Sequence, residues 1–192
     1  MKLKFASVLT LSLLTIPAIS ARAATPLGTA TAVTSAGKPI AATGTLDDAQ
    51  IAKIVLTINE GEIDAGKMAK KDAKSKAVKD FAAMMVSEHE KNIKETNAWV
   101  KKAGISPADS PISEKLMADA KTSNADLKKT PKAGIDKTYV SQQVMMHEKA
   151  LNSFDKDLIP SATNPDLKAH LTKTRAAVAE HLEHAKGLQG KM

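Results

Sequence analysis

The chain has 192 residues, a formal net charge of +7 and no cysteine. Without cysteine it can form no disulfide, offers no cysteine nucleophile and cannot be acylated on an N-terminal cysteine. Only five aromatic side chains (three Phe, one Trp and one Tyr) are available to stack on bases, and the lysines are spread along the chain. These features argue against a nucleic-acid-binding protein.

Residues 1–23 have the pattern of a secretory signal peptide. Lys2 and Lys4 form a basic start, residues 8–19 are mainly apolar, and Ala-Arg-Ala at 21–23 offers a cleavage site of small residues. Cleavage there would remove three basic residues and lower the net charge from +7 to +4. We therefore expect a periplasmic or secreted protein, with no membrane span once the signal is removed.

Residues 24–44 consist mainly of Ala, Thr, Gly, Ser and Pro and carry a single charge. Such a composition cannot bury enough apolar surface to order itself, so we expect a flexible leader. The folded domain is expected to cover residues 45–192. A capping-box pattern formed by Thr45 and Asp48 predicts the start of its first helix.

The first half of this domain has a helical period, with apolar residues recurring every three or four positions. One apolar stripe covers residues 51–69. A second covers residues 78–100, with Ser75 as the predicted N-cap and Gly104 as the C-cap. A shorter helix is predicted near residues 111–128, after the cap signal Ser110-Pro111.

The second half repeats the pattern. Asp136 is the predicted N-cap of a helix with a stripe over residues 140–158, and Asn164-Pro165 of a last helix with a stripe over residues 167–188. Since no alternating strand pattern occurs, the fold class is all-α. Four long helices, with a long connection carrying a short extra helix between the second and third, predict a ferritin-like antiparallel four-helix bundle.

Each long helix carries one polar residue on its buried stripe: Glu62, His89, His147 and His181. In an antiparallel hairpin, two residues at equal distance from the turn lie at the same height. Glu62 and His89 are centred at position 75.5, beside Ser75, and the two later histidines at position 164, the Asn164 cap. If the two hairpins align, all four side chains converge.

One carboxylate and three imidazoles suit a divalent transition metal such as zinc, iron, manganese or copper. We therefore predict that Glu62, His89, His147 and His181 bind one metal ion. Gln143, Glu88, Asp64 and Glu180 are candidates to orient the ligands. His170 and His184 lie off the stripe or at a helix end, and both are expected to be exposed.

Two alternatives remain open at this point. The first is a metal-dependent oxidoreductase of the ferritin-like type. A di-iron centre is disfavoured, because Val86, Val144 and Val178 replace the glutamates of the Glu-x-x-His motif. The second is a non-catalytic structural or interaction module, in which the buried Glu and His residues satisfy one another by hydrogen bonding.

Four segments together resemble a known family: "EIDAGKMA" (62–69), "FAAMMVSEH" (81–89), "IDKTYVSQQVMMH" (135–147) and "EHLEHA" (180–185). They are similar to the domain-of-unknown-function 4142 family, which comprises exported bacterial proteins often labelled outer-membrane proteins. The resemblance covers roughly residues 46–190 and implies a ferritin-like fold. One departure is Ile135, where the family usually has Phe.

Overall fold

The computed structural model describes residues 45–192 of the chain. Every regular element in this part is a helix, as the sequence predicted, and no strand occurs among these residues. The elements are α1 (Asp48–Asp72), α2 (Lys76–Ala103), α3 (Pro111–Lys129), α4 (Ile135–Ser153), a π-helical segment η1 (Phe154–Leu158), α5 (Ile159–Ser161) and α6 (Pro165–Gln189). The predicted signal peptide (1–23) and leader (24–44) lie outside the described residues.

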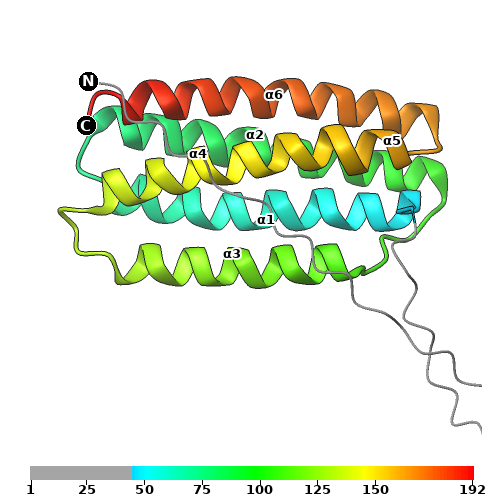
Figure 1. Cartoon of the computed structure of the whole chain (residues 1–192), viewed down its shortest axis with the longest axis horizontal. Helices are drawn as coiled ribbons and strands as arrows, with labels where there is room; N and C mark the ends of the chain where they lie inside the picture. The colour runs from blue at the N-terminus through cyan, green and yellow to red at the C-terminus, as the bar shows by residue number, and fades with distance from the viewer. Residues whose placement is uncertain (1–44) are drawn as a thin grey trace, which may run out of the picture. The chain divides into compact units, whose positions relative to one another are not determined.

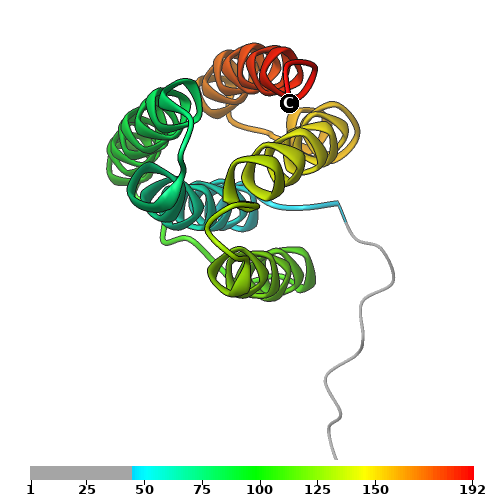
Figure 2. The same ribbon diagram turned by 90° about the vertical axis from the view of Figure 1, so that its left-hand side faces the viewer.

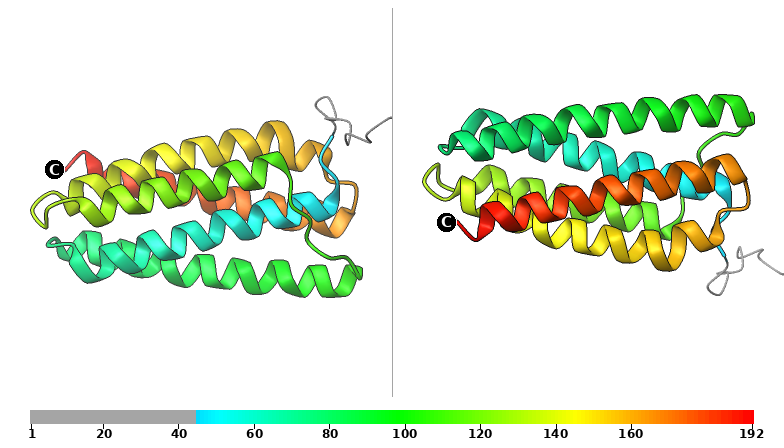
Figure 3. Two further views of the ribbon diagram at one scale, coloured as in Figure 1. Left: turned by 90° about the horizontal axis from the view of Figure 1, so that it is seen from below. Right: turned by 90° about the horizontal axis from the view of Figure 1, so that it is seen from above.

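Four long helices, α1, α2, α4 and α6, run side by side (Figure 1). α1 packs on α2 and α4 packs on α6, and these pairs meet through α2–α6 and α1–α4 contacts. An end-on view shows the four helices around a common centre, with α3 on the outside (Figure 2). α3 contacts α1 and α4, and it runs between them when the molecule is seen from below (Figure 3).

Side chains cap the N-terminal ends of α1, α3 and α6. Ser110 caps α3, and Asn164 caps α6 by accepting from the backbone N–H groups of Asp166 and Leu167. α2 ends at Gly104, whose φ of 66° places it in the left-handed region that favours glycine. The predicted Thr45–Asp48 box is wrong by two residues, because Asp47 and Gln50 form the capping box of α1.

The predicted N-cap role of Asp136 is also wrong. α4 begins at Ile135 after Gly134, so Asp136 already lies in its first turn. The Asp136 carboxylate instead accepts from the backbone N–H groups of Lys74 (2.9 Å) and Ser75 (3.0 Å), in the turn between α1 and α2. This residue therefore ties the α1–α2 turn to the start of α4, a tertiary contact with no local sequence signal.

The core consists of two apolar clusters at opposite ends of the helices. One contains the end of α1, the start of α2 and the start of α4, around Phe81 and Tyr139. The other contains the start of α1, the end of α2 and the start of α6, around Trp99 and Phe154. A layer of buried polar side chains lies between these clusters along each helix: Asn59, Glu62, His89, Gln143, His147 and His181.

The buried stripe of α2 departs from the predicted one after His89. Thr96 and Trp99 are buried, whereas Ile93 and Val100 are half-buried. Val78, Met85 and Trp99 keep to a seven-residue spacing, which suits helices that pack at a shallow angle better than a strict 3.6-residue period does. Among residues 45–192, no helix is both long enough and apolar enough to cross a lipid bilayer.

Candidate metal centre

The polar layer receives side chains from all four long helices. α1 contributes Asn59 and Glu62, α2 contributes His89, α4 contributes His147, and α6 contributes His181. All five residues are buried, with at most 5% of their surface exposed. Buried polar groups need partners in the protein or in a bound guest, because a lost contact with water is costly.

The structure brings three of the four predicted ligands together as one group. One ring nitrogen from each of His89, His147 and His181 lies within 4.8 Å of the other two. The ring centroids are 5.4 to 6.1 Å apart. Two nitrogens bound to one metal at about 2.1 Å are at most about 4 Å apart, so any pair near the 4.8 Å limit must come closer together to bind one ion.

Glu62 lies beside this group but is not part of it. Its carboxylate is 3.9 Å from His147 Nδ1, and its Oε2 accepts a 2.7 Å hydrogen bond from the Gln143 side-chain amide. The structure thus places Glu62 in the same layer, next to one of the three imidazoles. Its role as a fourth ligand stays a prediction.

The contacts of His89 determine which of its nitrogens can bind a metal. The Asn59 amide group donates to the backbone carbonyl of Val55 at 2.7 Å, and this turns Asn59 Oδ1 toward the histidine. His89 Nδ1 lies 2.7 Å from that oxygen. Because an amide oxygen only accepts, Nδ1 carries the proton and Nε2 keeps its lone pair.

In the other two histidines as well, one ring nitrogen is hydrogen-bonded to an acceptor. His147 Nδ1 lies 2.9 Å from the Gln143 backbone carbonyl, and His181 Nε2 lies 2.7 Å from the Glu88 carboxylate. Both acceptors require a protonated nitrogen, which leaves Nε2 of His147 and Nδ1 of His181 as the free lone pairs. Each imidazole is thus oriented by an acceptor on its far side, as metal-binding histidines usually are.

Two of these lone-pair nitrogens have no hydrogen-bond partner within residues 45–192. They are His89 Nε2 and His181 Nδ1, both buried. An unsatisfied buried polar atom costs about 1–3 kcal/mol. The three-histidine group therefore has unused ligand capacity in the buried layer.

Burial keeps the imidazoles uncharged. It lowers the pKa of His147 to about 4, and it lowers the pKa of His89 well below its ordinary value, with the neighbouring histidines adding to the effect. The pKa of His181 is also lowered by burial, although the Glu88 hydrogen bond opposes this. Neutral imidazole is the form that binds metals, so the ligands are ready at neutral pH.

Glu62 responds to burial in the opposite direction. Loss of water contact raises the pKa of its carboxyl to about 7, even though the Gln143 hydrogen bond and, when it is protonated, His181 favour the ionised form. A cation bound nearby would favour the carboxylate. Glu62 can therefore supply a full negative charge when a metal is present and be about half protonated near pH 7 when it is absent.

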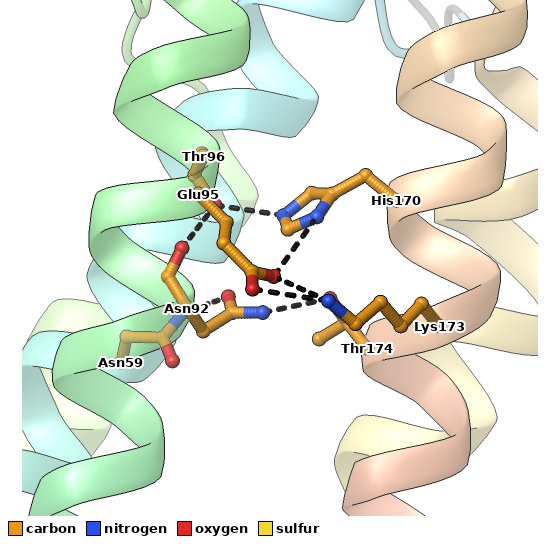
Figure 4. Close-up of polar contacts among 7 residues, drawn as sticks. All are labelled: Asn59, Asn92, Glu95, Thr96, His170, Lys173 and Thr174. Carbon is orange, nitrogen blue, oxygen red and sulfur yellow. Dashed lines mark hydrogen bonds and ion pairs between the residues drawn. The ribbon is translucent and has the colours of Figure 1, made fainter.

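The layer is accessible from one side. A cleft of about 200 Å³ between α2 and α6 is lined by His89 and His181, with Glu88, Asn92 and Lys173 nearer the surface. Figure 4 shows the polar contacts that cross from α2 to α6 beside it. On the opposite side, Glu62 of α1 and Gln143 of α4 are buried.

Sequence reasoning missed Asn59 and misplaced some of the supporting residues. Asn59 falls four residues after Val55 and three before Glu62, which is a helical spacing that could have placed it on the buried stripe. Glu88 does orient His181, but Asp64 and Glu180 are exposed. His184 is exposed as expected, whereas His170 is half-buried and contacts Thr96 Oγ1 at 2.9 Å.

Comparison of the chain with known protein families identifies the family to which it belongs. The family model for DUF4142, a domain of unknown function, matches residues 33–188. The chain belongs to this family. The match contains all three histidines, Glu62 and Asn59. Searches of curated proteins and of solved structures found no match.

Proposed function

We propose that this DUF4142 protein is exported and binds one divalent transition metal ion in the polar layer of a ferritin-like helical bundle formed by residues 45–192. His89, His147 and His181 are the ligands, and zinc, iron, manganese and copper are the candidate metals. The role that suits such a protein is metal handling or stress tolerance in the periplasm. Export rests on the signal-peptide pattern of residues 1–23.

One observation carries the proposal. Three buried imidazoles from three helices have ligand atoms within 4.8 Å of one another, and one nitrogen of each ring lies next to a hydrogen-bond acceptor. A structural hydrogen-bonded network would satisfy its own members. Here His89 Nε2 and His181 Nδ1 are left without partners in the described part of the chain, which favours a metal over such a network.

Glu62 is the proposed fourth ligand or the counter-charge of the site. It is the only carboxylate among the buried residues of the described part, and it lies 3.9 Å from Nδ1 of His147, the nitrogen that donates to Gln143 rather than the proposed ligand nitrogen. A dication held by neutral imidazoles keeps its full charge in a dry core, so a nearby carboxylate stabilises it. A single buried carboxylate also favours one metal ion rather than two.

A metal-dependent oxidoreductase is the second candidate. It is favoured by the cleft between α2 and α6, since two of the three histidines line it. A redox-active metal that small molecules can reach would support such chemistry. A closed site would support storage or a structural role.

Metal binding can be tested by equilibrium dialysis of the mature protein with each candidate metal, followed by elemental analysis. We expect one ion per chain for the wild type, with binding lost in His89→Ala, His147→Ala and His181→Ala. His184→Ala is the matched control, because His184 is exposed on the same helix as His181 and should bind like the wild type. A wild type that retains no metal, or four variants that all bind equally, would refute the proposal.

A further inference from the structure

Two members of the three-histidine group line the cleft between α2 and α6. His89 from α2 and His181 from α6 line it, and these are the two residues whose lone-pair nitrogens lack a partner within residues 45–192. The other two long helices close the site from behind, where Gln143 and Glu62 are buried against each other. The α2–α6 side is therefore the side on which the cleft comes next to the group, although the two lone-pair nitrogens themselves are buried.

We propose that this cleft is a binding site for a small inorganic anion, which enters between α2 and α6 and binds the metal held by the histidines. The inference rests on the proposed function, because the metal provides the charge that selects the ligand. It goes further by assigning the class of ligand and the face from which that ligand arrives.

The size of the cleft limits the ligand. Its volume is about 200 Å³, below the roughly 300–1,000 Å³ of sites that hold larger organic ligands. The inner wall includes the small or apolar side chains of Ala177 and Val178. The cleft therefore suits a ligand of a few heavy atoms better than a larger organic substrate.

The charges of the residues that line the cleft determine whether the ligand is an anion or a cation. Two carboxylates and two ammonium groups line the cleft, so their charges cancel: Glu88, Glu95, Lys91 and Lys173. Glu88 is engaged with His181, and Glu95 forms an ion pair of 3.0 Å with Lys173. At the inner end of the cleft the Glu62 carboxylate offsets only part of the charge of a dication, and the remaining positive charge attracts an anion.

Hydrogen bonds beside the cleft hold the two helices at a fixed separation. Asn92 of α2 donates to Thr174 Oγ1 of α6 at 2.8 Å, and the Glu95–Lys173 pair makes a second bridge (Figure 4). Asn92 also accepts from Asn59, the residue that orients His89. The same polar contacts therefore support both the cleft and one of the proposed ligands.

The test uses Cu(II)-loaded protein and azide as the probe anion. Azide bound to copper gives a charge-transfer absorption band, and we expect a saturable band with the wild type. Ala177→Phe fills the cleft and should weaken azide binding by about tenfold or more. Ala176→Phe is the matched control, because Ala176 is its exposed neighbour on α6 and should leave azide binding unchanged.

Copper affinity is measured first for every variant, so that loss of metal is not mistaken for loss of azide. Ala177→Leu, which adds less volume, replaces Ala177→Phe if the larger side chain prevents folding or copper binding. A copper-loaded wild type without an azide band, or Ala177 variants that bind azide like the wild type, would overturn the inference. A wild type that binds no copper or other candidate metal would instead refute the proposed function, and this inference with it.

Discussion

Asn59 shows how a residue outside the proposed ligand set can control the site. Its amide group donates to Val55 O and to Asn92 Oδ1, so its own oxygen is directed at His89 Nδ1. This fixes both the proton and the ring orientation of His89. Residues that hold metal-binding histidines in this way typically contribute about 10–100-fold to metal affinity.

Asn59→Leu should therefore lower the metal affinity by about 10–100-fold while leaving all three imidazoles in place. Leucine has a similar size but gives His89 Nδ1 no acceptor. Isothermal titration with zinc measures the change. Asn97→Leu, at an exposed position of α2, is the control and should bind zinc like the wild type. Equal affinity in Asn59→Leu would show that this hydrogen bond does not position His89.

The raised pKa of Glu62 gives a second prediction at this scale, for the metal-free protein. Its folded-state pKa is about 7, against 4.5 as the ordinary value. The folded state therefore binds more protons than the unfolded state between these values, and this group's contribution to stability falls as pH rises from about 4.5 to 7. Above pH 7 the lost contribution is on the order of 3 kcal/mol.

Glu62→Gln does not titrate and should remove that decline. We expect the variant to gain stability relative to the wild type as pH rises from 4.5 to 8, because the substitution removes the Glu62 contribution, and the histidines titrate in both proteins and affect the difference only through their interaction with Glu62. Urea denaturation in the presence of a chelator measures the difference at each pH. A stability difference that stays constant across this range would show that Glu62 ionises in the folded chain as easily as in water.

At the scale of helices, the helix ends that depend on local contacts could be predicted from the sequence, and the features that depend on tertiary contacts could not. Ser110, Asn164 and Gly104 cap helices through contacts within a few residues, so the sequence alone located these ends. Asp136 looks like an N-cap, but it bonds to a turn some sixty residues away. The burial of Thr96 in place of Ile93 likewise depends on how α2 packs against its neighbours.

The close approach of α1 and α2 gives a prediction at this scale. A Cβ at Gly66 would lie 2.8 Å from Val86 Cγ2 and 3.2 Å from the Ala82 carbonyl oxygen, and the backbone oxygen cannot move away easily. Gly66→Ala should therefore destabilise the protein by about 1–3 kcal/mol, despite the better helix propensity of alanine.

Gly187→Ala is the matched substitution on α6. A Cβ there would meet nothing within 4 Å, so only the helix propensity changes, and we expect a gain of about 0.5–1 kcal/mol. Urea denaturation of both variants beside the wild type measures the two effects. If the variants moved in the same direction, close α1–α2 packing at Gly66 would not be a determinant of stability.

At the scale of the whole molecule, the arrangement of the two apolar clusters explains why the histidines meet. Each long helix has an apolar segment on either side of its polar residue, and packing these segments with their counterparts aligns the four helices in register. Because the polar residues are equally spaced from the two turns, the sequence predicted that they lie at the same height along the helices. The position of Glu62 beside the group, and the support from Asn59, depend on side-chain contacts that spacing does not encode.

X-ray absorption spectroscopy of the zinc-loaded mature protein tests the central claim most directly. We predict a first shell dominated by nitrogen at about 2.0–2.1 Å, with the outer-shell scattering of three imidazole rings. The ring count should stay at three in His184→Ala, whereas His181→Ala should retain no zinc. A shell made mainly of oxygen, or a wild-type spectrum with fewer than two imidazole rings, would contradict the account of a three-histidine metal centre.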